Sequence, residues 1–331
     1  MRQFFIIVFG GLFAIVAGVG IAYGGSFAWK HFRPQLSKLS SYTNLASLAL
    51  RNESDSASLV DALKSSTSIS GTKKTIRYTA SEEEDLINAA EQALPSGSDD
   101  RIKAKAYLLK NLTRGDVTID YESDRLLPIA SVSKLVTAVI ARRLIDSAER
   151  ITITKEIMSR YGNTAIFNVG ETFKASDLYY PLLMVSSNDA AEALAQDYDR
   201  KKFIKAMNDW VQSIGAYRTY FEDPSGLSVH NVSTANDLAL IMDWIRKNDP
   251  DIIKMTLLKS KTVRSHTWVN PTHFLSWSYY IGGKNGFTSE ANNTAVSLFT
   301  LGKNKNVYVA VLLNTGNRDA DMIRLVGKVR E

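Results

Sequence analysis

Hydrophobic periodicity changes twice along residues 100–331, and this change constrains the fold more than any other feature of the chain. Strand-like runs open and close the region, whereas apolar residues at helical spacing fill its middle. The expected strands are Ala106–Asn111, Val117–Tyr121, 262–269, 295–300 and 307–313. One expected helix begins at Ser131, and four more cover 187–195, 203–214, 234–247 and 319–329. We therefore predict an α/β (α+β) fold with one antiparallel sheet, built from N- and C-terminal strands and packed against helices, around a mostly helical inserted region.

The N-terminal part of the chain differs in character from the rest. No charged residue occurs from Phe4 to Trp29, a run longer than the ~20 residues that span a bilayer as a helix. Aromatic residues occupy its far end, where a secretory signal has small residues at a cleavage site. We expect a transmembrane signal-anchor at residues 1–30, with a cleaved signal peptide as the open alternative. The polar, Ser-rich stretch that follows predicts a flexible stalk over 31–98, with a short helix near 81–94, before a folded domain at 99–331.

Composition excludes several kinds of site. The formal net charge is +6, but Lys and Arg form no block, so we expect no nucleic-acid partner. The chain has no cysteine, which excludes disulfides, thiol nucleophiles and Cys-ligated metals. Neither a Gly-x-Ser-x-Gly elbow nor a His-Glu-x-x-His motif occurs, and each of the four histidines is expected to be structural or exposed. We therefore expect no metal and no cofactor.

Ser131 and Lys134 form a Ser-x-x-Lys pattern. On one helix this spacing places both side chains on the same face, one turn apart. A serine hydroxyl becomes a good nucleophile when a base removes its proton, and a lysine can be that base if burial or positive neighbours lower its pKa. The pattern alone does not distinguish such a pair from an exposed helix face, because Ser70 and Lys73 repeat it within the polar stretch.

Two further patterns follow along the chain. Ser186, Ser187 and Asn188 precede an Ala-rich run, where they predict either a helix cap or a proton-relaying hydroxyl beside an amide that holds a substrate carbonyl. Residues 282–288, Gly-Gly-Lys-Asn-Gly-Phe-Thr, predict either a β-turn or an edge strand that borders a cleft with Lys284 facing in. Each pattern alone leaves both interpretations open.

In their order and spacing, the three patterns resemble the signature of the low-molecular-mass penicillin-binding proteins, the serine-type D-alanyl-D-alanine carboxypeptidases. The likeness covers about residues 100–331 and includes the stretches 127–138, 221–227 and 233–239. The resemblance implies a β-lactamase/transpeptidase-like fold. It also implies an enzyme that trims peptidoglycan stem peptides through an acyl-enzyme, with β-lactams as covalent inhibitors.

The resemblance implies a role for each matching residue. Ser131 would be the nucleophile and Lys134 its general base, while Ser186 would carry the proton to the leaving amine. The residues that would bind the substrate are Asn188, Lys284, Asn285 and Gly286. The backbone N–H groups of Ser131 and Phe287 would form the oxyanion hole. Because peptidoglycan lies outside the cytoplasm, we expect the domain on the extracytoplasmic side of the cell membrane, held by a single N-terminal span.

Two departures from the family pattern occur. Asn292 and Asn293 stand where the family tends to have Gly, which bears on loop shape, whereas the other departure bears on the chemistry. Asn285 stands where the family has Thr, so an amide replaces a hydroxyl that normally donates to the substrate carboxylate. Losing or misplacing one charge-assisted hydrogen bond costs ~1.5–3 kcal/mol. A DD-endopeptidase or a β-lactamase would use the same residues, the latter with a deacylating carboxylate for which Glu222 is at a suitable distance. A non-catalytic wall-binding or β-lactam-sensing protein also stays open, because of Asn285.

Overall fold

The computed structural model describes residues 101–159, 162 and 164–329. The signal-anchor and the stalk with its short helix, expected over residues 1–98, lie outside the described residues. Within those that are described, no helix is both long enough and apolar enough to cross a membrane.

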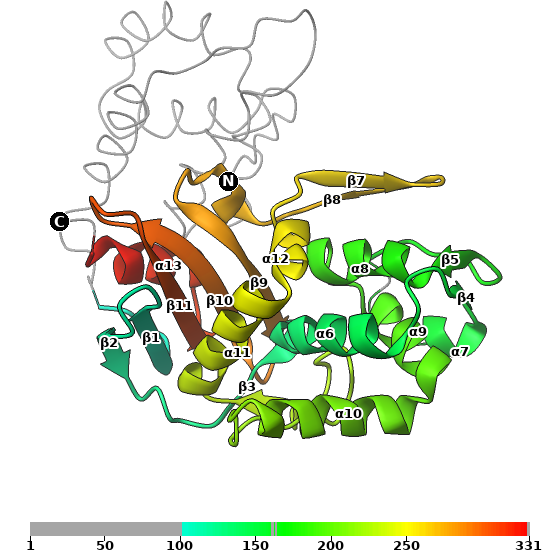
Figure 1. The fold of residues 1–331 in the computed structure, drawn as a ribbon, viewed down its shortest axis with the longest axis horizontal. Coiled ribbons are helices and arrows are strands. Elements are labelled where there is room, and N and C mark those ends of the chain that lie inside the picture. Colours follow the sequence, from blue (N-terminus) through cyan, green and yellow to red (C-terminus); the bar gives the residue numbers. More distant parts are fainter. Residues whose placement is uncertain (1–100, 160–161, 163, 330–331) are drawn as a thin grey trace, which may run out of the picture. The chain divides into compact units, whose positions relative to one another are not determined.

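One five-stranded antiparallel sheet forms the centre of the domain, in the order β2-β1-β11-β10-β9 (Figure 1). Its strands are β1 (Ala106–Asn111), β2 (Val117–Tyr121), β9 (Tyr280–Thr288), β10 (Asn292–Leu301) and β11 (Asn306–Thr315). The first strand pairs with the last, with Leu109 opposite Ala310, so both ends of the domain meet inside the sheet. This pairing confirms the predicted antiparallel sheet, and β1 and β2 have the predicted bounds.

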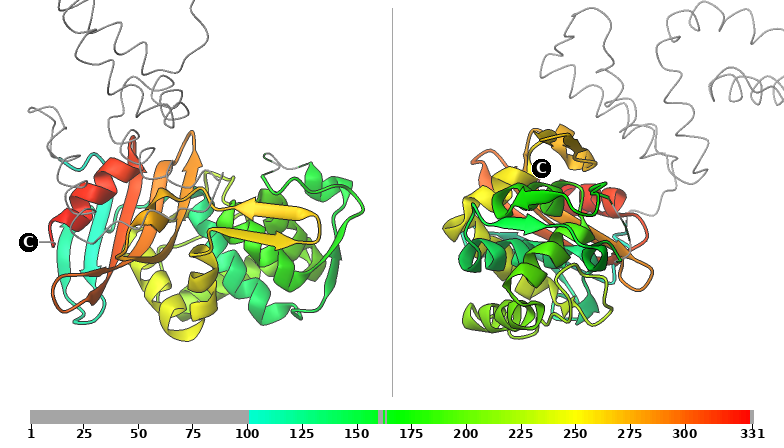
Figure 2. Two further views of the ribbon diagram at one scale, coloured as in Figure 1. Left: turned by 90° about the horizontal axis from the view of Figure 1, so that it is seen from above. Right: turned by 90° about the vertical axis from the view of Figure 1, so that its right-hand side faces the viewer.

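Helices cover both faces of the sheet, because its central strands are apolar on both sides. Along β11, Val309 packs into one core while the next residue, Ala310, packs into a second core. The first core includes residues of α11 (Ala235–Asn248) and the second includes residues of α13 (Arg318–Gly327). Figures 1 and 2 show these two helices on opposite faces of the sheet.

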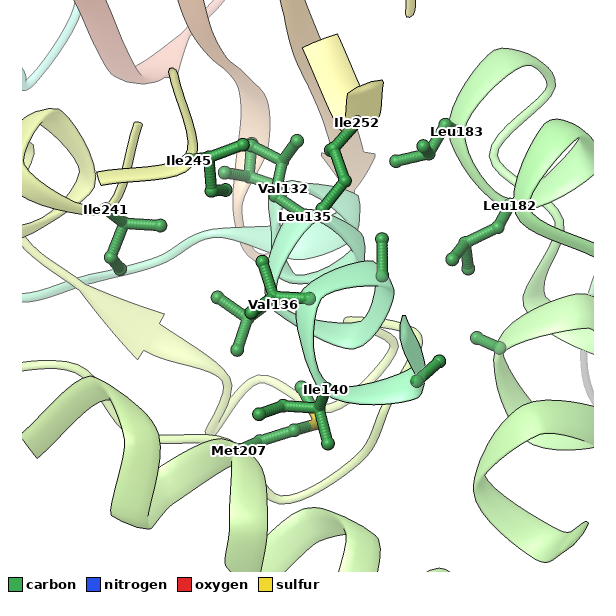
Figure 3. Packing of buried hydrophobic residues seen from close by; sticks show 14 of the residues in the cluster. Val132, Leu135, Val136, Ile140, Leu182, Leu183, Met207, Ile241, Ile245 and Ile252 are labelled. Atoms are coloured by element: carbon green, nitrogen blue, oxygen red, sulfur yellow. The ribbon is translucent and has the colours of Figure 1, made fainter. Parts of the chain in front are cut away.

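The helical region lies beside the β9 edge of the sheet (Figure 1). It contains α6 (Lys134–Leu144), α7 (Lys155–Met158), α8 (Ala175–Met184), α9 (Asn188–Tyr198), α10 (Arg200–Ser213) and α12 (Pro250–Thr256). Helix α6 is central, since every residue from Lys134 to Ala141 is buried. Figure 3 shows side chains of α8, α10, α11 and α12 gathered around it. A helix enclosed in this way holds its side chains in one place, and α6 carries the lysine of the first motif.

The structure corrects the predicted elements in several places. The run 262–269 is not one strand but a hairpin, β7 (Ser260–Val263) and β8 (His266–Val269), which turns at Arg264 with a left-handed φ of 53°. The sequence does not predict α8, which contains Pro181, or α12, which has seven residues. Two further strand pairs are too short for periodicity to reveal: β3 (Leu127–Pro128) with β6 (Val232–Ser233), and β4 (Arg150–Thr152) with β5 (Thr172–Lys174).

Leu135→Ala should lower the free energy of unfolding by about 2–5 kcal/mol, because it leaves a cavity at the centre of the helical region. Leu135 is 1% exposed, whereas Leu144 of the same helix is 36% exposed. Leu144→Ala is therefore the matched control, with an expected loss of about 0.5 kcal/mol. Denaturant unfolding followed by circular dichroism measures both losses. Equal losses would contradict the central position of α6.

Candidate active site

The first motif folds as a tight turn that runs into a buried helix. Ser131 lies in the 3-10 helix η3 (Ala130–Ser133), and Lys134 is the first residue of α6. The sequence predicts one continuous α-helix here, but the tighter turn also brings the two side chains together, with Lys134 Nζ 2.8 Å from Ser131 Oγ. Ala130 has a left-handed φ of 48°, and a Cβ on Gly226 would lie 1.9 Å from its carbonyl oxygen. This close approach requires glycine at position 226.

Lys134 is fully buried, and its side-chain nitrogen has three acceptors around it. Nζ donates to Ser131 Oγ at 2.8 Å, to Asn188 Oδ1 at 2.8 Å and to the Ser225 carbonyl at 2.5 Å. Burial, and next the positive charge of Lys284, hold the pKa of Lys134 well below its usual range. Three donated bonds describe the ammonium form. The neutral amine retains two N–H groups, enough for Asn188 and Ser225, and its lone pair can then accept the Ser131 proton, which is what a nucleophilic serine requires.

The second motif serves as a helix cap and as a polar contact at once. Ser187 Oγ accepts a hydrogen bond from the Ala190 N–H at 3.1 Å and so caps α9. Ser186 Oγ instead accepts a hydrogen bond from Lys284 Nζ at 3.0 Å. The φ of Ser186 is 59°, a left-handed conformation that is uncommon outside glycine and is often found at functional sites. The helix-cap interpretation is confirmed for Ser187, and the proton-relaying role of Ser186 stays a prediction.

The third motif is an edge strand and not a turn. Lys284 lies within β9, at the edge of the sheet, and is 6% exposed. Besides its bond to Ser186, its Nζ donates to the Asn285 carbonyl at 2.8 Å. Burial, and next the positive charge of Arg318, lower the pKa of Lys284 to about 7. Both the charged and the neutral form of this lysine are therefore populated near neutral pH.

Gly286 brings strand β9 against the turn that carries Ser131. A Cβ on Gly286 would lie 2.8 Å from the Ser131 nitrogen and 2.6 Å from Thr294 Oγ1. Thr294 of β10 donates to the Ile129 carbonyl at 3.0 Å, which ties the sheet to the same turn. Phe287 follows Gly286 along the strand, and its side chain is 65% exposed. The two residues predicted for the oxyanion hole, Ser131 and Phe287, therefore come from segments in direct contact.

Six of the eight predicted site residues form two hydrogen-bonded groups. The first contains Ser131, Lys134 and Asn188, and the second contains Ser186, Lys284 and Asn285. The charge of Lys284 links them, because it lowers the pKa of Lys134. Sequence reasoning does not single out the Ser225 carbonyl or Thr294. The sequence signal that could have pointed to Ser225 is the resemblance of the stretch 221–227 to the family pattern.

Two histidines contact carboxylates. His266 Nε2 is 3.1 Å from the carboxylate of Glu171, and His273 Nδ1 is 2.8 Å from that of Asp319. In the part of the chain that the structure describes, no three His, Asp or Glu side chains gather as a metal site. The basic side chain that contacts Ser131 Oγ is that of Lys134.

The family model for D-alanyl-D-alanine carboxypeptidases, peptidase S11, matches residues 91–316 of this chain. The D-alanyl-D-alanine endopeptidase of Escherichia coli (strain K12) is 32% identical over 239 residues, which cover 66% of this chain and 74% of that protein. The D-alanyl-D-alanine endopeptidase of Pseudomonas aeruginosa is 31% identical over 250 residues, which cover 71% of this chain and 77% of that protein.

Among solved structures, penicillin-binding protein D2 from Listeria monocytogenes, in its ampicillin-bound form, is similar with a TM-score of 0.62 and 25% identity. The similarity covers 70% of this chain and 98% of that one. The fold is that of the low-molecular-mass penicillin-binding proteins, as the resemblance implied. The chain belongs to the peptidase S11 family, the D-alanyl-D-alanine carboxypeptidases, whose members are serine peptidases of the cell wall.

Gly286→Ala should slow the acylation of Ser131 by about 100-fold or more, because a Cβ there would push β9 away from the Ser131 N–H. The matched control is Gly316→Ala, since among the described residues a Cβ at 316 would meet no heavy atom within 4 Å. The measurement is the second-order rate constant for labelling by a fluorescent penicillin. Equal rates in the two variants would show that β9 does not need this close approach.

Proposed function

We propose that this protein hydrolyses D-alanyl–D-amino acid bonds of peptidoglycan stem peptides through an acyl-enzyme on Ser131. The observation that carries the proposal is the contact of 2.8 Å between Lys134 Nζ and Ser131 Oγ, in an enclosed place that favours the neutral amine. A lysine in water would be an ammonium group near pH 7 and would have no lone pair to accept the proton. Burial therefore turns this lysine into a base.

In the first step, Lys134 Nζ takes the hydroxyl proton while Ser131 Oγ bonds to the carbonyl carbon of the penultimate D-alanine. The backbone N–H groups of Ser131 and Phe287 would stabilise the negative charge on the carbonyl oxygen. The scissile C–N bond then breaks, and Ser186 passes the proton from Lys134 to the leaving amine. Lys134 is neutral again when water attacks the ester, so it can take the proton of the water and return it to Ser131.

Lys284 is suited to attract the carboxylate next to the scissile bond, because it lies on the edge strand and contacts Ser186. Asn285 is half-buried on the same strand, where the family has Thr. Its amide can donate a hydrogen bond to the same carboxylate. The residues proposed for acylation are in contact with one another. We therefore favour an enzyme with weaker or altered substrate specificity over a non-catalytic wall-binding or β-lactam-sensing protein.

A carboxypeptidase and an endopeptidase would use this site in the same way. The sequence predicts a carboxypeptidase that releases the terminal D-alanine, and the family description carries that name. We favour an endopeptidase that cleaves the cross-link between two stem peptides, because two relatives at 31–32% identity carry the name D-alanyl-D-alanine endopeptidase. Since cross-links lie in the wall, we propose that the domain works outside the cytoplasmic membrane, held there by the uncharged segment near the N-terminus.

A fluorescent penicillin should label the protein covalently, and Ser131→Ala should abolish the labelling. Incubation with purified muropeptides, followed by liquid chromatography and mass spectrometry, should show cross-linked dimers converted to monomers faster than pentapeptides lose D-alanine. Labelling absent at any concentration would contradict the acyl-enzyme and favour the non-catalytic protein. Loss of D-alanine with intact dimers would assign the carboxypeptidase specificity instead.

The same label distinguishes a β-lactamase. Glu222 is exposed and accepts a hydrogen bond from Ser228 Oγ, which is not the setting of a buried deacylating base. The penicilloyl group should therefore persist on Ser131, and Glu222→Gln should leave its lifetime unchanged. Rapid release of the label that Glu222→Gln abolishes would identify a β-lactamase.

The value of kcat/KM for a substrate with a free carboxylate next to the scissile bond should fall as the pH rises through about 7. Lys284 is an ammonium group below its pKa of about 7 and neutral above it, so its attraction for the carboxylate is lost on the alkaline side. The control substrate carries an amide in place of that carboxylate and should show no fall at this point. An equal fall for both substrates would contradict the role of Lys284.

A further inference from the structure

Residues 223–228 form a turn beside the nucleophile, and a single carboxylate organises its backbone. Asp223 Oδ1 accepts hydrogen bonds from the Ser225 N–H at 2.6 Å, the Ser225 hydroxyl at 2.7 Å and the Gly226 N–H at 2.7 Å. Asp223 Oδ2 accepts one from the Ser228 N–H at 2.6 Å. Asp223 is 8% exposed. A buried carboxylate with this many donors holds the turn in one conformation.

The turn directs two successive carbonyl groups at helix α6. The Pro224 carbonyl accepts a hydrogen bond from Thr137 Oγ1 at 2.5 Å, and the Ser225 carbonyl accepts one from Lys134 Nζ at 2.5 Å. The next residue, Gly226, lies against the Ala130 carbonyl. The conformation of the turn therefore determines where the side-chain nitrogen of Lys134 is held.

Asn231 closes the other side of the same turn. Its Oδ1 accepts from the N–H groups of Glu222 and Asp223, at 2.9 and 3.1 Å. Its Nδ2 donates to the Asp223 carbonyl at 2.8 Å and to Ser133 Oγ at 3.1 Å. Because Ser133 belongs to η3, the turn is fastened to the segment that carries the nucleophile as well as to α6.

We propose that Asp223 is a positioning residue for the base of the reaction. It folds the turn so that the Ser225 carbonyl fixes Lys134 Nζ beside Ser131 Oγ, and its buried negative charge offsets the positive charges of the site. The inference rests on the proposed role of Lys134 as the base. Asp223 acts on Lys134 through the backbone of the turn and would not contact the substrate.

The charges around the base support this role. Asp223 from the turn raises the pKa of Lys134, against the effects of burial and of Lys284 from β9. Burial alone would raise the pKa of Asp223, but its N–H and hydroxyl donors outweigh burial and hold that pKa below its usual value. Asp223 is therefore charged at neutral pH. Other ionisable groups on the surrounding elements include Asp189 and Glu192 of α9, Arg200 of α10, Glu222 of the turn and Arg318 of α13.

Asp223→Asn is the first test, because it retains the side-chain shape and one acceptor oxygen but removes the charge. The rate constant for acylation by a fluorescent penicillin should fall about 10- to 100-fold. The acid limb of its pH profile should move to lower pH, because Lys134 loses the carboxylate that favours its ammonium form. Asp223→Glu restores the charge and should return the limb toward its wild-type position, although the longer side chain keeps the rate low.

Glu222→Gln is the matched control, since it removes a neighbouring, exposed carboxylate of the same segment. It should leave both the acylation rate and the acid limb at their wild-type values. A wild-type rate and profile in Asp223→Asn would overturn the proposal. A uniform fall with the acid limb in place would overturn it as well, because it would mean that Asp223 supports the fold alone.

Thermal unfolding checks that Asp223→Asn is folded. If it is not, Ser225→Ala takes its place, since this variant removes one donor to Asp223 and retains the Ser225 carbonyl and the charge. Its acylation rate should fall about two- to tenfold with the acid limb unmoved, and a wild-type rate would overturn the proposal. If the wild-type protein itself is not labelled, the proposed function has failed, so the two failures are distinguishable.

Discussion

The contact between Lys134 and Ser131 depends on the burial of Lys134, and the rest of the domain supplies that burial. A charged amine placed in an apolar interior without compensation is so costly that the group loses its proton instead. Helix α6 provides the enclosure, because helices α8, α10, α11 and α12 pack around it (Figure 3). The neutral form of Lys134 therefore depends on the packing of the helical region, and a loosened core would hydrate the lysine and restore its charge.

The second buried lysine comes from the sheet and not from the helical region. Lys284 on β9 and Lys134 on α6 both have lowered pKa values, and the charge of Lys284 contributes to the shift of Lys134. At neutral pH the unfolded chain binds more protons at these two groups than the folded chain does. By linkage, their contribution to stability increases as the pH rises toward the unfolded lysine value of ~10.4 and decreases toward acid. A substrate carboxylate beside Lys284 would restore part of the charge that folding disfavours, so binding and protonation are coupled.

The parts of the fold that the sequence predicts are those set by local pattern. Strands β1 and β2 flank a short turn that contains Gly115, and their bounds are predicted correctly. A spacing of three residues brings Ser131 and Lys134 together in the 3-10 turn as it would in an α-helix. The parts that the sequence misses depend on tertiary contact. The left-handed backbone of Ala130 and Ser186 has no signature in residue type, and the Ser225 carbonyl is a backbone atom that any residue would supply.

Backbone groups also explain why the departure at Asn285 leaves the frame of the site intact. The position of β9 beside Ser131 depends on Gly286, which has no side chain, and on Thr294, which ties β10 to the Ile129 carbonyl. The carbonyl of Asn285 still accepts from Lys284 Nζ, as the carbonyl of a threonine would. Only the side chain differs from the family pattern, and it lies on the strand expected to face the substrate and not beside Lys134. We therefore expect its effect on the choice of substrate, while Ser131 and Lys134 are held by contacts that do not involve the Asn285 side chain.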